Sequence, residues 1–103
     1  GGALRVGNAG AANETDRDLH DAFVIDGGRS AWIGELPAGT SRMPQGSLRV
    51  SELRSRLGPG PRRALFEFWW HRTDHGGRCL VGFAEGEPPD AAHRGVLVIV
   101  PLR

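Results

Sequence analysis

Several residue types are scarce in this 103-residue sequence. It contains one cysteine, one methionine, no tyrosine and no lysine. The lone thiol, Cys79, excludes an intrachain disulfide. The longest uninterrupted apolar run, residues 96–102, is seven residues long, whereas a membrane-spanning helix requires roughly 20. We therefore expect no direct membrane insertion by this fragment.

Net charge is also low. All thirteen basic residues are arginines, scattered along the chain, and against twelve acidic residues they leave a formal charge of +1. This balance gives no broad positive field, so no nucleic-acid partner is predicted. Apolar residues make up 39% and charged residues 24%, which is typical of a folded globular chain. The length predicts one domain over residues 1–103 with a modest core.

The most specific stretch is residues 20–39. An apolar alternation up to Ile25 leads into Gly27 and Gly28, and a second apolar stretch follows. Two adjacent glycines at the centre of a two-residue loop can both adopt positive φ, which predicts a tight β-hairpin rather than a phosphate-binding loop. Counting outward from the turn pairs Ile25 with Ser30, Val24 with Ala31, Phe23 with Trp32, and Ala22 with Ile33. Pro37 and Gly39 predict a second turn.

Other segments have clear signals. We predict a strand at 4–6 and a loop at 7–13, then a connection at 39–46 and a helix ending at Gly58-Pro59. A second helix would begin at Pro61, with residues 65, 68, 69 and 72 on one face, and end at Gly76-Gly77. The alternation of Phe66, Phe68 and Trp70 leaves a strand open there. Strands at 79–84 and 96–100, the latter central in its sheet, would flank a loop at 85–94.

Candidate binding residues concentrate near position 70. Phe66, Trp69 and Trp70 form a dense aromatic patch, which packs a core if buried and anchors a partner if exposed. His71, His75 and Cys79 carry zinc-ligand chemistry, with Asp74 or His93 as an additional ligand. The sequence offers no second pair of ligands to complete the expected pattern. The leading prediction is therefore that the chain binds no metal and no cofactor. A small metal-binding domain or metalloenzyme is the alternative.

Two further patterns precede the hairpin. Acidic residues between 14 and 21 lack the spacing of a calcium loop and are expected in an exposed loop. Asn13-Glu14-Thr15 matches a glycosylation acceptor. Because no serine lies in a Gly-x-Ser-x-Gly setting, no catalytic residue is assigned.

Residues 13–29 and 32–39 carry a strand with "N-x-T" and "L-x-D-A-x-V", a Gly-Gly hairpin and a "G-x-L-P-A-G" turn. These pieces, with residues 80–83 and 96–102, resemble extracytoplasmic domains of uncharacterised bacterial membrane-anchored proteins. The resemblance implies a mainly β, immunoglobulin-like antiparallel β-sandwich with a helical insertion at about 50–73; an α+β fold is the alternative.

The same resemblance implies a place in a larger protein. It predicts a periplasmic or cell-surface location, held by membrane segments outside this chain. It also predicts a non-catalytic structural or protein-interaction module, with other domains of the same chain or an envelope protein as partners.

Overall fold

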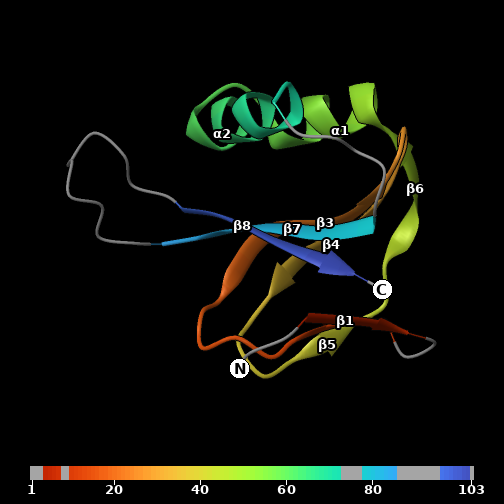
Figure 1. The fold of residues 1–103 in the computed structure, drawn as a ribbon, viewed down its shortest axis with the longest axis vertical. Helices are drawn as coiled ribbons and strands as arrows, with labels where there is room; N and C mark the ends of the chain where they lie inside the picture. The colour runs from red at the N-terminus through yellow and green to blue at the C-terminus, as the bar shows by residue number, and fades with distance from the viewer. Residues whose placement is uncertain (1–3, 8–9, 73–77, 86–95, 103) are drawn as a thin grey trace.

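A computed structural model of the chain describes residues 4–7, 10–72, 78–85 and 96–102. The protein is mostly β, with two antiparallel sheets and two short helices (Figure 1). The strands are β1 (Leu4–Gly7), β2 (Gly10–Asn13), β3 (Leu19–Asp26), β4 (Arg29–Leu36), β5 (Ser41–Arg42), β6 (Gln45–Arg49), β7 (Arg78–Ala84) and β8 (Val96–Leu102). The helices are α1 (Val50–Leu57) and α2 (Pro61–Trp70).

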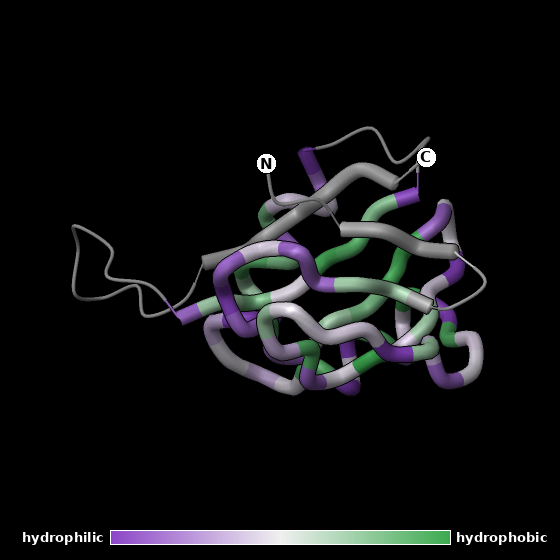
Figure 2. The backbone as a smooth tube through the Cα atoms, turned by 90° about the horizontal axis from the view of Figure 1, so that it is seen from below, coloured by the Kyte–Doolittle hydropathy of each residue, from purple (hydrophilic) through white to green (hydrophobic). Residues whose placement is uncertain are grey.

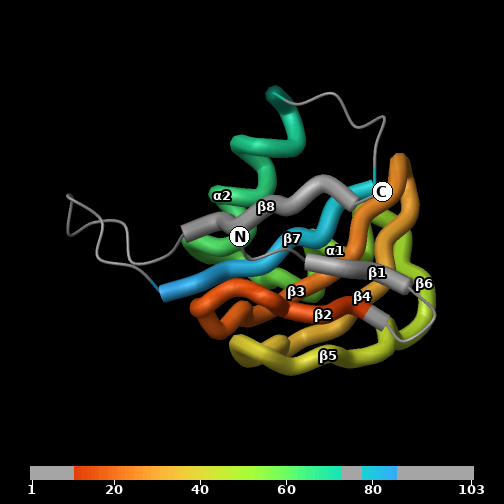
Figure 3. The backbone as a smooth tube through the Cα atoms, turned by 60° about the horizontal axis from the view of Figure 1, so that its bottom comes forward, coloured from red at the N-terminus to blue at the C-terminus, as the bar shows by residue number. Residues whose placement is uncertain are grey.

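The chain is arranged in three layers. A five-stranded sheet of order β6-β4-β3-β7-β8 forms the middle layer, and a three-stranded sheet of order β1-β2-β5 lies on one side of it. Both helices cover the opposite face (Figure 1). Strand β1 contacts β8, so the small sheet reaches the edge strand of the large one. Figure 3 shows β2 and β5 of the small sheet side by side. The helices come between β6 and β7, as the predicted insertion requires.

The predicted hairpin forms as β3 and β4. Ile25 pairs with Ser30, Val24 with Ala31, and Phe23 with Trp32, as counted from the turn. One feature of the turn differs from the prediction: Gly27 has a φ of 63°, whereas Gly28 is not among the residues with positive φ. A positive φ at the first central residue alone is the pattern of a type II′ turn rather than type I′.

The predicted pairing of Ala22 with Ile33 is wrong. Ala22 pairs with Gly34, and the register shifts on both sides of this pair. Against β7 the same region of β3 holds an extra residue, because His20 pairs with Phe83 and Phe23 with Val81. Such a bulge lets Leu19 and Ala22, three residues apart, join the same side of the sheet. Simple alternation from the turn does not anticipate this shift.

Both faces of the middle sheet are buried. Towards the small sheet lies a cluster of eight buried side chains: Ala11, Leu19, Ala22, Val24, Ile33, Leu36, Leu80 and Ala84. Towards the helices lies a second cluster: Phe23, Ile25, Leu53, Phe66, Val81 and Phe83. In Figure 2, several hydrophobic (green) stretches run through the middle of the molecule. A sheet buried on both faces explains why β3 and β7 read as nearly continuous apolar runs.

Helix boundaries follow local chemistry. In α1, Leu53 is fully buried, and the chain turns away at Gly58, whose φ is 70° and whose N–H donates to the carbonyls of Arg54 and Ser55. Helix α2 begins at Pro61 as predicted, since proline at the first position needs no hydrogen-bond partner for its nitrogen. It ends at Trp70, before the predicted Gly76-Gly77 stop, which lies outside the described residues.

Three predictions for irregular or central segments are wrong. The expected loop at 7–13 contains β2, and the expected connection at 39–46 contains β5 and the start of β6. Strand β8, expected at the centre, lies at the end of the strand order. Pairing decided these outcomes: β2 pairs with β1 and β5, β6 pairs with β4, and, among the described strands, β8 pairs with β7 alone. The loop predicted at 85–94 lies almost entirely outside the described residues. Within the described part, no helix has the length and apolar content to cross a membrane.

Asn13 joins the small sheet to the turn after β4. Its side chain is 1% exposed, and its Nδ2 donates to the carbonyls of Arg17 (2.7 Å) and Leu36 (2.8 Å). Its Oδ1 accepts from the N–H and the hydroxyl of Thr15. Glycosylation of Asn13 at this acceptor pattern therefore conflicts with the structure, because the amide nitrogen is buried and fully hydrogen-bonded. Gly39, with a φ of 75°, donates its backbone N–H to the carbonyl of Asn13.

Candidate functional site

The connection between the two helices shapes one wall of a pocket. It consists of Gly58, Pro59 and Gly60, and both glycines have positive φ, 70° and 141°. Residues with a Cβ rarely adopt these values, so the glycines permit the sharp reversal that places α2 after α1. The pyrrolidine rings of Pro59 and Pro61 then present rigid apolar surface on either side of the reversal.

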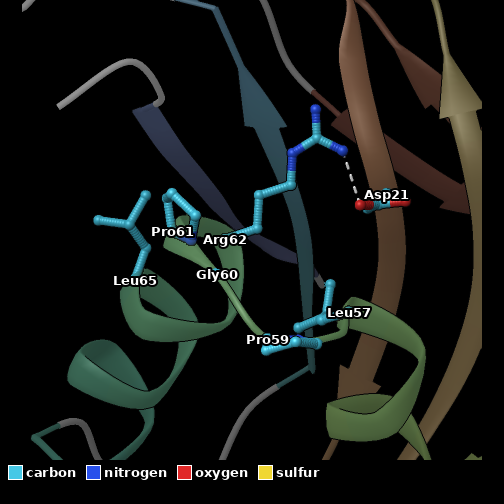
Figure 4. Close-up of a pocket in the computed structure, with 7 residues that line it drawn as sticks. All are labelled: Asp21, Leu57, Pro59, Gly60, Pro61, Arg62 and Leu65. Atoms are coloured by element: carbon cyan, nitrogen blue, oxygen red, sulfur yellow. Dashed lines mark hydrogen bonds and ion pairs between the residues drawn. The ribbon is translucent and has the colours of Figure 1, made fainter.

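The pocket has a volume of about 290 Å³ and an open, mostly apolar lining. Figure 4 shows the lining side chains from α1, the helix connection, α2 and β3. They are Asp21, Leu57, Pro59, Gly60, Pro61, Arg62 and Leu65. The sequence contains no motif that joins these positions, because they meet only when the helices fold over the sheet.

One ion pair fixes the polar edge of the pocket. The guanidinium of Arg62 donates through Nη1 to Oδ2 of Asp21 at 2.7 Å, across 41 residues of sequence. Their side chains are 44% and 28% exposed. Asp21 has a φ of 48°, the only positive φ of a non-glycine residue in the described chain, and it lies within the bulge of β3. The prediction of an exposed loop at 14–21 is therefore wrong for Asp21, which is part of a strand.

The aromatic patch divides between core and surface. Phe66 is fully buried and contacts the ring of Phe23 edge-on, with ring centroids 5.7 Å apart. It is therefore a core residue and cannot anchor a partner, contrary to one of the two predicted roles. Trp69 and Trp70 are half-buried and pack against the same cluster. Phe68, predicted to share a helix face with Leu65, Trp69 and Arg72, is 62% exposed.

Phe68 belongs to a stripe along α2 that starts at the pocket. Positions 61, 65, 68 and 72 follow the four-, three- and four-residue spacing that places side chains on one helix face. Pro61 and Leu65 line the pocket, and the guanidinium of Arg72 lies 3.8 Å from the ring centroid of Phe68. We call Pro61, Leu65, Phe68 and Arg72 the α2 stripe. It extends the apolar surface of the pocket towards the end of the helix.

A charge network joins the two helices. The carboxylate of Glu67 accepts a hydrogen bond from Nε of Arg54 and lies 3.0 Å from Nε2 of His71. Partial desolvation alone would raise the pKa of Glu67, but the hydrogen bonds and positive charge of Arg54, with those of His71, outweigh it and lower the pKa below its ordinary value of 4.5. Glu67 is therefore a charged link between α1 and α2.

The predicted metal ligands are not brought together in the described part of the chain. His71 contacts Glu67, whereas Cys79 lies in β7, opposite Ile25 of β3. Burial raises the pKa of the Cys79 thiol above its ordinary value, which disfavours the thiolate that binds zinc. His75, Asp74 and His93 lie outside the described residues. Among those described, no group of three or more metal-ligating side chains occurs.

The site combines an apolar hollow, an ion pair and an exposed aromatic ring. Comparison of the chain with protein-family models, curated proteins and solved structures gave no match.

Proposed function

We propose that this chain is a non-catalytic protein-interaction module, built as an immunoglobulin-like β-sandwich with a helical insertion. Support for the sandwich comes from two antiparallel sheets with a buried apolar cluster between them. The chain also leaves the large sheet after β4 and returns to it at β6, as sandwich strands do when they change sheets. The helices, which cover the outer face of the large sheet, carry the binding surface.

The proposal includes a place in the cell. The resemblance of residues 13–39 to extracytoplasmic domains supports a periplasmic or cell-surface position within a membrane-anchored envelope protein. The partner is then another domain of that protein or a separate envelope protein.

One observation carries the interaction role: the α2 stripe leaves Phe68 exposed beside a pocket. A large aromatic ring that is 62% exposed gains much of its burial energy only when another surface covers it. Exposed apolar surface next to a pocket is typical of protein-binding sites. Arg72, stacked on the ring, already covers one face of it, so a partner would approach the other face and the pocket.

Site-specific photo-crosslinking in the full-length protein tests this role in its own cells. A photoreactive phenylalanine analogue replaces Phe68, and the same analogue replaces Ser41, an exposed residue of β5 in the opposite layer, as the control. We expect a discrete adduct from position 68 and none from position 41. Absence of an adduct at 68, or equal adducts at both positions, would contradict an interaction through the helices.

A further inference from the structure

We infer that the partner segment is acidic and inserts an apolar side chain into the pocket between α1, α2 and β3, with its carboxylates facing Arg62 and Arg63. This inference rests on the proposed interaction role and specifies the chemistry of the partner. It comes from the distribution of charge in the fold and from the composition and size of the pocket.

Positive charge concentrates in the helical layer. Residues 49–72, which contain both helices, hold six arginines and two acidic residues, for a net charge of +4. All other residues together hold seven arginines and ten acidic residues, for a net charge of −3. The overall value of +1 hides this separation. Because α1 and α2 lie together on one face of the sheet (Figure 1), this face of the fold carries the net positive charge of the segment, which favours a partner of opposite charge.

The two acidic residues of this layer are already engaged. Glu67 is held by Arg54 and His71, and Glu52 accepts the backbone N–H of Arg49 at the start of α1. Neither carboxylate is therefore directed at the arginines beside the pocket. At the pocket, Asp21 of β3 pairs with one nitrogen of Arg62, and the other donors of that guanidinium are open to a partner's carboxylate.

Arg62 lines the pocket, and Arg63 follows it in α2. Nη1 of Arg62 donates a hydrogen bond to Asp21. The guanidinium has further N–H donors, arranged so that they can bind a second carboxylate. The side chain of Arg63 is exposed and makes no hydrogen bond or ion pair with other described residues. Asp21 holds Arg62 at the pocket edge, so its position is set before a partner binds.

The lining of the pocket suits an inserted apolar side chain. Its volume of about 290 Å³ is at the lower end of the range of about 300–1,000 Å³ typical of ligand pockets. Leu57, Pro59 and Leu65 offer a leucine or phenylalanine an apolar surface. Nucleic acid fits less well, since phosphate groups gain nothing from the mostly apolar lining of the pocket.

Selection from a random 12-residue peptide display library, with the full chain as bait, tests this chemistry. We expect enriched peptides to combine aspartate or glutamate with leucine or phenylalanine. A fluorescently labelled enriched peptide should lose about tenfold or more in affinity for Arg62→Gln, since breaking a charged hydrogen bond costs an amount of this order. Arg42→Gln, an exposed arginine of β5 in the opposite layer, is the matched control and should bind as the unchanged chain does.

Each other outcome overturns the inference. Enrichment of neutral or basic peptides, no enrichment, or equal losses for Arg62→Gln and Arg42→Gln would exclude an acidic partner at this pocket. Tighter binding of a single-stranded oligonucleotide than of the best peptide would favour nucleic acid instead. Circular dichroism of both variants shows that they fold. The crosslinking at position 68 decides the interaction role separately, so an adduct there without acidic peptides would refute the partner chemistry alone.

Discussion

Replacing Phe66 by alanine should be among the most damaging single changes in the helical layer. The side chain is fully buried, and its ring centroid lies 5.7 Å from that of Phe23, 6.1 Å from Trp69 and 5.8 Å from Trp70. Truncating a buried phenylalanine removes its transfer energy and leaves a cavity, which together cost about 3–5 kcal/mol. A domain of this size has a total stability of about 5–15 kcal/mol, so the loss is a large fraction.

Urea unfolding, monitored by tryptophan fluorescence and circular dichroism, measures the change in the free energy of unfolding. A loss of about 3 kcal/mol would lower the melting temperature by at least about 12 °C in a domain of this length. The matched control is Phe68→Ala, two residues along the same helix but 62% exposed, for which we expect a change within about 0.5 kcal/mol. Phe66→Leu, with a smaller loss, keeps the comparison measurable if the alanine variant does not fold. Equal losses at positions 66 and 68 would refute the docking of α2 through the Phe66 ring.

Three other changes test the remaining structure. Gly27→Val should lower the free energy of unfolding by about 1–3 kcal/mol, because valine tolerates a φ of 63° poorly. Gly28→Ala, with open space around its Cβ, should be nearly neutral in the same unfolding assay. Equal effects would contradict the turn assignment. Asn13→Ala should cost about 2–4 kcal/mol, since it leaves buried carbonyls without donors, and an unchanged melting temperature would exclude the hydrogen-bonded link. For Glu67, the lowered pKa means that its stabilisation is present above the unfolded value of 4.5 and is lost as pH falls through the folded pKa. The stability difference from Glu67→Gln should therefore be constant above about pH 5.5 and shrink in more acidic solution, and a difference that grows there would show that the sign is wrong.

The hairpin was predictable because its determinants are local. Two adjacent glycines between apolar alternations fix the turn and the first three pairs outward, from Ile25 to Phe23. The prediction failed at Ala22, where the bulge depends on packing Leu19 between the sheets. The start of helix α2 at Pro61 was likewise predictable, but periodicity alone could not tell that Phe66 would be buried and Phe68 exposed.

The candidate site was not predictable from the sequence. Asp21 and Arg62 are 41 residues apart and belong to no shared motif, and the pocket exists only because the Gly58-Pro59-Gly60 reversal lays α2 across the sheet. The aromatic residues gave a partial signal, since they marked α2 as important. Most of these aromatic side chains are buried or half-buried and belong to the core.

By itself, the sequence determined the mainly β composition, the turn at Pro37 and Gly39, the hairpin and the two helices, because these depend on backbone preferences and short-range periodicity. Tertiary structure decided which strands became edges, which aromatic ring remained exposed, and where charge gathered. Those outcomes depend on contacts between segments far apart in the chain, and a side chain's exposure and electrostatic neighbours are set only when these segments pack together.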